Sequence, residues 1–264
     1  MKILLTGHKG FIGQHMLLAL LLRNHDVSVY DWGDDESALD ITNKKYDRVI
    51  HMGAISSTTE TDIAKLIKQN YSFSILLFNR CMSNQIPFQF SSSASVYGDS
   101  TTFNEEDTPS PLNEYARTKY LFEEYMRPYM NNTYEEHTPV QAFRYFNVYG
   151  PEGEEHKGKQ ASPFYQFKKQ YEETGKVKVF EGSENFRRDF IHVSEVVDIH
   201  LKFLDITESG IWNVGTGKTM SFMDVAKKFT DKIETIPMPE NLKLHYQKYT
   251  CADMTKLNKT LNRC

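Results

Sequence analysis

The chain has 264 residues and a formal net charge of −4 at pH 7, a length that allows one large domain or two lobes. No basic excess favours nucleic acid or an anionic membrane as a partner, and the longest apolar run, at 16–22, is too short to span a bilayer. Three widely spaced cysteines form neither a disulfide framework nor a zinc pattern, so we expect a cytoplasmic protein without a metal site.

The first half alternates short apolar runs with helical patterns. Strands are predicted at 2–6, 26–31, 47–52, 87–92 and 139–146, and helices at 11–23, at 62–81 and from Asn113 to Pro128. The acidic segment 32–46 leaves little room for a helix between its strands. This β-α-β alternation predicts an α/β protein with a doubly wound parallel sheet, whose ligands bind at the carboxyl ends of the strands.

From residue 149 onward the pattern becomes loop-rich, with glycines, charges and aromatics interleaved. We therefore predict a dinucleotide-binding domain at 1–148 and a smaller C-terminal substrate lobe at 149–264. Part of 190–215 is expected to return to the sheet of the first domain.

A glycine-rich turn, TGHKGFIG at 6–13, joins the first strand to the first helix and places Gly7, Gly10 and Gly13 in the spacing G-x-x-G-x-x-G. Such a turn lets a pyrophosphate approach the backbone, and the helix N-terminus supplies oriented N–H groups. Asp31 stands where a carboxylate binds the adenosine ribose hydroxyls. The acidic WGDDE after it favours NAD over NADP. The alternatives are an ordinary glycine turn, a plain strand-end aspartate and, for Lys9, a solvated loop residue.

A second motif joins SSSASVYG (91–98), after the fourth predicted strand, to YARTK (115–119) at the start of a helix. Tyr115 and Lys119 are four residues apart, so they lie side by side on one helix face. An ammonium beside a phenol lowers the phenol pKa from about 10, and Tyr115 can then take a hydroxyl proton while hydride leaves the carbon. A lone pair of this kind is more often a solvent-facing contact.

With these motifs in this order, the chain resembles the extended short-chain dehydrogenase/reductase family, which has a Rossmann sheet. The resemblance implies that Ser93 positions the substrate oxygen, that Tyr115 is the acid/base, and that Lys119 supports it and holds the nicotinamide ribose. Sugar dehydratases of the family carry Thr-Asp-Glu where this chain has Ser-Ala-Ser at 93–95. An epimerase or a reductase is therefore preferred to a dehydratase.

Later stretches resemble one subfamily, the ADP-glycero-manno-heptose 6-epimerases: SSTTE (56–60), FRYFNVYGP (143–151), HKG (156–158), FEGSENFRRDF (180–190), NVGTG (213–217) and YQKYT (246–250). The resemblance implies an ADP-heptose-like nucleotide-diphosphate sugar as substrate and Lys157 as a second acid/base. The heptose side-chain carbon would be oxidised, turned and reduced from its other face. From the loop alone, Lys157 is one more charge in a mobile segment.

The motifs and the resemblance together assign two further sets of residues. The cofactor set is Gly7, Gly10, Phe11, Ile12, Gly13, Asp31, Trp32, Met52, Gly53, Ala54, Ser56, Asn70, Lys119 and Val148. The substrate set is Ser57, Ser93, Asn147, Lys159, Gln166, Phe180, Glu181, Gly182, Ser183, Arg188 and Tyr246. A guanidinium suits a diphosphate through paired hydrogen bonds. The alternatives are a surface salt bridge for Arg188 and core packing for Tyr246.

The chain also departs from the subfamily. Lys159 and Gln166 replace a serine and a histidine, which leaves the sugar open, and the shortened loop after the second strand lacks a lysine used near the adenosine phosphate. That loss favours NAD, whereas the resemblance also allows NADP. The last residues, LNKTLNRC, lack an expected final helix, so either the lobe is minimal or a partner subunit covers it; we expect a homo-oligomer. Other readings are another nucleotide-sugar 4-epimerase, a reductase, or a non-catalytic dinucleotide-binding module.

Overall fold

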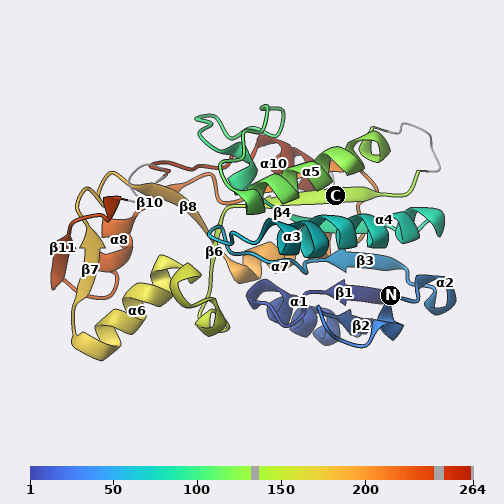
Figure 1. The fold of residues 1–264 in the computed structure, drawn as a ribbon, viewed down its shortest axis with the longest axis horizontal. Coiled ribbons are helices and arrows are strands. Elements are labelled where there is room, and N and C mark those ends of the chain that lie inside the picture. The colour runs from blue at the N-terminus through green and yellow to red at the C-terminus, as the bar shows by residue number, and fades with distance from the viewer. Residues whose placement is uncertain (132–136, 241–246, 263–264) are drawn as a thin grey trace.

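The protein is described by a computed structural model over residues 1–131, 137–240 and 247–262, without the side chains of His156 and Lys159. A six-stranded parallel sheet forms the larger lobe (Figure 1). Its order is β2 (Asp26–Tyr30), β1 (Lys2–Thr6), β3 (Arg48–His51), β4 (Phe88–Ser93), β5 (Val140–Tyr145) and β9 (Gly210–Val214). The predicted doubly wound sheet is confirmed. Because the order reverses between β1 and β3, a crevice is expected at their carboxyl ends.

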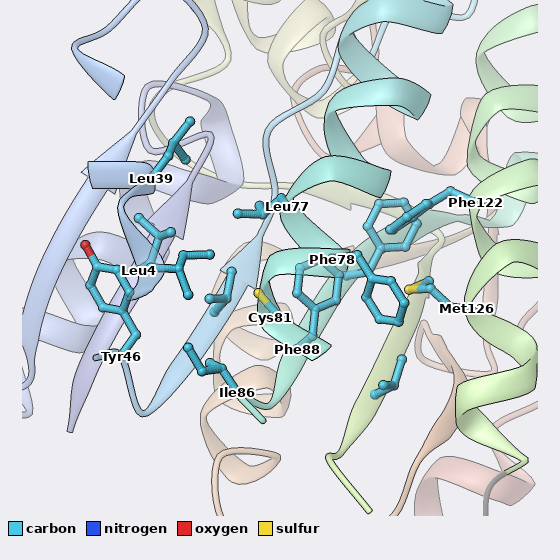
Figure 2. Packing of buried hydrophobic residues seen from close by; sticks show 14 of the residues in the cluster. Leu4, Leu39, Tyr46, Leu77, Phe78, Cys81, Ile86, Phe88, Phe122 and Met126 are labelled. Carbon is cyan, nitrogen blue, oxygen red and sulfur yellow. The ribbon is translucent and has the colours of Figure 1, made fainter. Parts of the chain in front are cut away.

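Apolar side chains on both faces of the strands explain why this sheet is covered by helices on two sides. Leu4 and Val49 join a cluster with α4 (Phe73–Ser83) and α5 (Glu114–Met130), where the rings of Phe78 and Phe88 pack edge to face 5.3 Å apart (Figure 2). Neighbouring residues such as Ile3 and Leu5 point the other way, toward α1 (Phe11–Leu22) and α7 (Val193–Lys202). Parallel strands buried on both faces have this nearly continuous apolar sequence.

Two helices differ from their predicted bounds. The helix predicted at 62–81 is divided into α3 (Ile63–Leu66), a π-helical turn, η2 (Ile67–Ser72), and α4. The helix predicted to end at Pro128 continues for two residues, to Met130, so that the proline lies inside its last turn. In the short acidic segment only single turns form, η1 (Glu36–Leu39) and α2 (Ile41–Lys44), as its length predicts.

The second half is not loop-rich, contrary to the prediction. It contains β6 (Asn147–Tyr149), η4 (Glu155–Gln160), α6 (Pro163–Thr174), β7 (Val177–Phe180), β8 (Arg187–His192), β10 (Thr219–Ser221), α8 (Phe222–Lys227) and β11 (Ile233–Ile236). The strands pair in the orders β10-β8-β6 and β11-β7. These strands are short, and charged residues interrupt their apolar positions. The alternation of apolar and polar residues that would predict a strand is therefore difficult to see in the sequence.

The end of the described chain also forms a helix, α10 (Thr255–Leu261), where none was expected. Leu257 of α10 is buried in the cluster that contains Trp212 of β9, and the Trp212 indole donates a hydrogen bond to Thr260, 3.1 Å away. Within the described ranges, no helix is long and apolar enough to cross a membrane.

Candidate functional site

A cavity of about 560 Å³ lies between the carboxyl ends of the sheet strands and the second lobe. It is where the reversal of strand order predicts a ligand. Sequence-predicted residues from both lobes line it together: Gly7, Gly10, Phe11, Ile12, Gly13, Met52, Ala54, Ser56, Ser93, Tyr115, Asn147, Val148, Lys157 and Arg188.

The glycine turn is packed so closely that side chains would not fit at two of its glycines. Gly7 has φ +78°, and a Cβ atom there would lie 2.4 Å from the backbone nitrogen of Gly53. A Cβ on Gly13 would lie 2.0 Å from the Gly7 carbonyl oxygen. Helix α1 begins after Gly10, which has no side chain to cap the first-turn N–H groups. These groups and the helix dipole therefore remain available for an anion at the cavity wall.

A smaller cavity is lined by, among others, Gly7, Asp31, Trp32, Gly53 and Ala54, which are residues predicted to bind the cofactor. The Asp31 carboxylate accepts hydrogen bonds from the backbone N–H groups of Lys9 (3.1 Å) and Trp32 (2.8 Å). The exposed Lys9 ammonium forms an ion pair with Asp34. Lys9 is thus neutralised, and the surroundings of Asp31 carry negative charge.

Asn70, a residue of the predicted cofactor set, lies behind the wall of the cavity and does not form part of its lining. It is 1% exposed, its side-chain oxygen accepts from the backbone N–H of Ile55 (2.8 Å), and its amide donates to the Ile55 carbonyl (3.0 Å). Asn70 sits in the π-helical turn, and it thereby fixes the loop that carries Gly53, Ala54 and Ser56. Ser57, another predicted contact, uses its hydroxyl within this loop, 3.1 Å from that of Thr59.

The Ser–Tyr–Lys set comes from β4 and the start of α5. The Asn113 side chain caps α5 by accepting from the N–H of Ala116 (2.8 Å), which places Tyr115 in the first turn. The Lys119 ammonium donates to the Ser91 carbonyl (2.7 Å) and lies 6.0 Å from the centre of the Tyr115 ring. Ser93 ends β4 and, with Tyr115, lines the main cavity.

The predicted direction of the Tyr115 pKa is reversed in this structure. Burial raises the pKa of Tyr115, and the neighbouring Ser93 hydroxyl only reduces that effect. Burial also lowers the pKa of Lys119 to about 7, against the opposing influence of the Glu123 carboxylate. Both groups are taken out of water, and loss of hydration disfavours the charged form of each.

Lys157 is a positioned side chain, not a mobile loop charge. Its ammonium lies 3.5 Å from Glu154 and 4.3 Å from the centre of the Phe11 ring. The fully buried Glu154 carboxylate also accepts hydrogen bonds from the backbone N–H and hydroxyl of Ser162 (2.6 and 2.7 Å). Burial lowers the pKa of Lys157, and Glu154 opposes this.

A second, largely apolar cavity of about 510 Å³ lies in the smaller lobe and shares Ala161 and Pro163 with the main one. Three predicted substrate residues, Gln166, Phe180 and Ser183, line it. The Ser183 hydroxyl is buried and has no hydrogen-bond partner among the described residues. The two cavities therefore lie next to each other on either side of this shared wall.

Arg188 stands at the main cavity, and it is held in place rather than exposed. It donates to the carbonyls of Arg187 (3.0 Å) and Gln247, and its guanidinium lies 5.6 Å from the Phe222 ring centre. Glu181 and Gly182, the latter with φ +81°, form the turn after β7. Tyr246 and the side chain of Lys159 lie outside the described part of the chain.

Tyr145 is a cavity residue that the sequence analysis did not single out. It ends β5, and its hydroxyl is within hydrogen-bond distance of the Ser91 hydroxyl (2.7 Å) and His200 Nε2 (2.5 Å). Its signal was its place in FRYFNVYGP, directly at the carboxyl end of a predicted strand. Thr250, also at the cavity, carried no comparable signal.

Comparisons with known proteins agree with this geometry. A family model described as "NAD dependent epimerase/dehydratase family" matches residues 3–215. The chain is similar to the ADP-L-glycero-D-manno-heptose-6-epimerase of Helicobacter pylori, with 25% identity and a TM-score of 0.83 over 99% of this chain and 90% of that one.

The same fold is present in two further solved structures. The UDP-N-acetylglucosamine 4-epimerase of Methanobrevibacter ruminantium has 23% identity and a TM-score of 0.85, over 98% of this chain and 91% of that one. The UDP-glucose 4-epimerase of Thermotoga maritima has 23% identity and a TM-score of 0.84, over 99% and 93%.

Proposed function

Because the chain belongs to the NAD dependent epimerase/dehydratase family, we propose that it is a nucleotide-sugar epimerase that inverts the side-chain carbon of an ADP-heptose-like substrate. The observation that carries this proposal is the meeting of Ser93, Tyr115 and Lys157 at one cavity, with Lys119 behind Tyr115. Two separate acid/base groups suit a reaction in which a carbon is approached from both faces.

The residues present fit a nicotinamide dinucleotide, since the glycine turn, the uncapped start of α1 and Asp31 follow one another along the groove. A bound nicotinamide would supply a reversible hydride acceptor for the sugar carbon. Ser93 holds the reacting oxygen, and the deprotonated form of Tyr115 takes its proton as the alcohol becomes a ketone. After the ketone turns, Lys157 supplies the proton to the oxygen as the alcohol forms again.

NAD is the cofactor that we propose over NADP. The 2′-phosphate of NADP would meet the Asp31 carboxylate, and Lys9, whose backbone N–H bonds to Asp31, already has its ammonium paired with Asp34. The phosphate and the Asp31 carboxylate are both negative and would repel each other. The ion pair between Lys9 and Asp34 would have to break before Lys9 could relieve this repulsion.

We propose 149–264, apart from the part of 190–215 that returns to the sheet, as the substrate lobe. Arg188 and Asn147 stand at the main cavity, where a diphosphate would lie. Phe180 and Ser183 line the apolar cavity, where the unsatisfied Ser183 hydroxyl suits a polar edge of the base. Ser57, Glu181, Gly182, Lys159, Gln166 and Tyr246 remain proposed contacts.

A second candidate is a 4-epimerase of another nucleotide sugar. It is favoured by Gln166, which lines the apolar cavity where the subfamily pattern has a histidine, and whose amide donates to the Gly158 carbonyl (3.0 Å). A changed lining of this cavity changes which nucleotide or sugar fits.

The test is NMR of ADP-glycero-manno-heptose, UDP-glucose and UDP-N-acetylglucosamine, each incubated with the protein and NAD. We expect epimerisation of the ADP-heptose, and Tyr115→Phe should lower its rate about 10²–10⁴-fold because the proton acceptor is lost, while cofactor binding is retained. Tyr129→Phe, in the same helix but 40% exposed, is the matched control and should keep full activity.

Other outcomes select other functions. Inversion of a UDP-sugar alone favours the 4-epimerase, and net consumption of NADH with a keto-sugar favours a reductase. Cofactor binding without turnover of any sugar nucleotide indicates a binding module. Undiminished epimerisation by Tyr115→Phe would rule out the proposed mechanism.

We also propose a homo-oligomer. Leu76 of α4 and Leu121 of α5 are 48% and 37% exposed on adjacent helices, and a second copy would cover them. Light scattering on the eluted protein tests this, since a monomeric mass contradicts it.

A further inference from the structure

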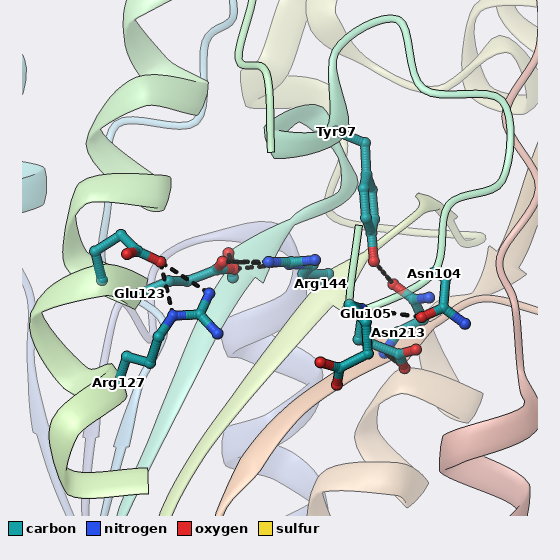
Figure 3. A network of polar contacts seen from close by, with 10 residues as sticks. Tyr97, Asn104, Glu105, Glu123, Arg127, Arg144 and Asn213 are labelled. Carbon is teal, nitrogen blue, oxygen red and sulfur yellow. Dashed lines mark hydrogen bonds and ion pairs between the residues drawn. The ribbon is translucent and has the colours of Figure 1, made fainter. Parts of the chain in front are cut away.

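A buried ion pair joins α5 to β5 (Figure 3). Glu123 of α5 and Arg144 of β5 are both fully buried, and Arg144 donates to the carboxylate at 2.7, 3.1 and 3.2 Å. Removing two charges from water costs several kcal/mol per ion, and apolar replacements of such pairs are often as stable. Stability alone therefore does not explain why these charges are here.

The position of Glu123 connects it to two members of the site. Glu123 follows Lys119 by one helical turn, so the two side chains share a face of α5. The Glu123 carboxylate also accepts a hydrogen bond from the Ser92 hydroxyl (2.5 Å), and Ser92 immediately precedes Ser93. In Figure 3 the Arg144 guanidinium lies between this carboxylate and the ring of Tyr97, 4.7 Å from the ring centre.

We propose that Glu123 is a positioning residue: its carboxylate, paired with Arg144, is the counter-charge for the Lys119 ammonium, and its bond to Ser92 anchors the strand end that presents Ser93. The expected effect of Glu123 on turnover rests on the proposed function. Its expected effect on the charge of Lys119 does not rest on that function, because this charge can be measured without a substrate.

The other groups around Lys119 do not supply a negative charge. His51 of β3 is held by Thr6 (2.6 Å) and Ser74 (2.8 Å), and burial lowers its pKa to about 3, so it is neutral. On α5 itself, burial raises the pKa of Tyr115 and so disfavours its phenolate.

On the remaining sides Lys119 meets β4 and β5. From β4 it contacts the Ser91 carbonyl and the Phe90 ring, 4.6 Å away. From β5, Tyr145 reaches Ser91 through its hydroxyl, and burial raises its pKa as well. Arg144, also on β5, is cationic and paired with Glu123. Among the described groups around Lys119 that are named here, Glu123 is thus the one that supplies a negative charge.

The test is a pH titration of the Lys119 side chain by ¹³C NMR in protein labelled at the lysine ε-carbons, with Lys119→Arg used to assign its signal. In Glu123→Gln the ammonium loses its counter-charge, so its titration midpoint should fall by about 1–3 pH units. In a plot of kcat against pH, the fall or rise at alkaline pH should move to lower pH together with the titration midpoint of Lys119.

Glu105→Gln is the matched control. Glu105 is also a buried carboxylate, bonded to the N–H of Asn213 (2.8 Å), and it is not among the groups that act on Lys119. Its variant should leave the Lys119 midpoint in place. A folded Glu123→Gln protein with the wild-type midpoint overturns the inference.

A second variant keeps the test decisive if Glu123→Gln does not fold, since that change leaves Arg144 buried without a full partner. The double substitution Glu123→Leu with Arg144→Met removes both charges and is expected to fold. It should lower the Lys119 midpoint in the same direction, and an unchanged midpoint contradicts the inference. Absence of epimerisation with a shifted midpoint would instead count against the proposed function alone.

Discussion

At the scale of single residues, burial decides the chemistry of Tyr115 and Lys119 more than their adjacency does. Their spacing brings them together, yet loss of hydration raises the pKa of the phenol and lowers that of the ammonium. A lysine whose pKa is near 7 in the folded protein is destabilising, because the unfolded chain holds its proton over a wider pH range. The site therefore has a cost in stability, as functional sites often do.

This gives a prediction for stability against pH. The folded-state pKa of Lys119, about 7, lies below the ordinary 10.5, so between these values the unfolded chain binds one more proton. From this group, stability rises with pH by about 1.4 kcal/mol per unit. In Lys119→Met that contribution is lost, so the slope measured by urea unfolding between about pH 7.5 and 9.5 should be smaller. The exposed Lys218→Met should keep the wild-type slope, and equal slopes in all three proteins contradict the prediction.

At the scale of elements, the start of α5 determines where Tyr115 and Lys119 stand. Asn113 adopts an extended backbone and caps the helix through its side chain, so the first turn begins at a defined residue. At the other end, Pro128 is tolerated because it lies close to the C-terminus of the helix. The Asn113 cap thus fixes where Tyr115 and Lys119 stand against β4.

Asn113→Ala should lower the free energy of unfolding by about 1 kcal/mol, because the N–H of Ala116 loses its acceptor. It should also reduce kcat, since the first turn carries Tyr115. Asn113→Ser restores a capping oxygen and should recover most of both losses. Urea unfolding and steady-state kinetics check this, and an alanine variant as stable as the serine variant argues against the cap.

At the scale of the whole molecule, the site exists only where the two lobes meet. The glycine turn, Ser93 and Tyr115 belong to the sheet lobe, whereas Lys157 and Arg188 come from later segments, and all of them line one cavity. A ligand that fills such a groove binds the folded chain and not the unfolded one. Cofactor binding should therefore raise stability by mass action.

NAD at about 100 times its Kd should stabilise the fold by about 2.7 kcal/mol, which for a chain of this size raises Tm by about 2–4 °C per kcal/mol. NADP at the same concentration should give a smaller rise. Asp34→Asn should increase the response to NADP, because Lys9 is then free to meet the additional phosphate. Equal shifts with NAD and NADP in the wild-type protein would contradict the proposed preference.

The amino-acid sequence by itself determined the features that depend on neighbours along the chain. The period of the apolar residues predicted the parallel sheet, the glycine spacing predicted the strand-turn-helix of Gly7–Gly13, and a spacing of four predicted that Tyr115 and Lys119 share a helix face. Such patterns are local, so they can be seen without knowing what packs against them.

Only the tertiary structure decided the rest. The direction of the Tyr115 pKa, the hydrogen bonds of Asn70 to Ile55 and the pairing of Glu123 with Arg144 all depend on contacts between distant segments. Burial and charge pairing are properties of a three-dimensional environment. A residue's place in the sequence does not say how much water will remain around it.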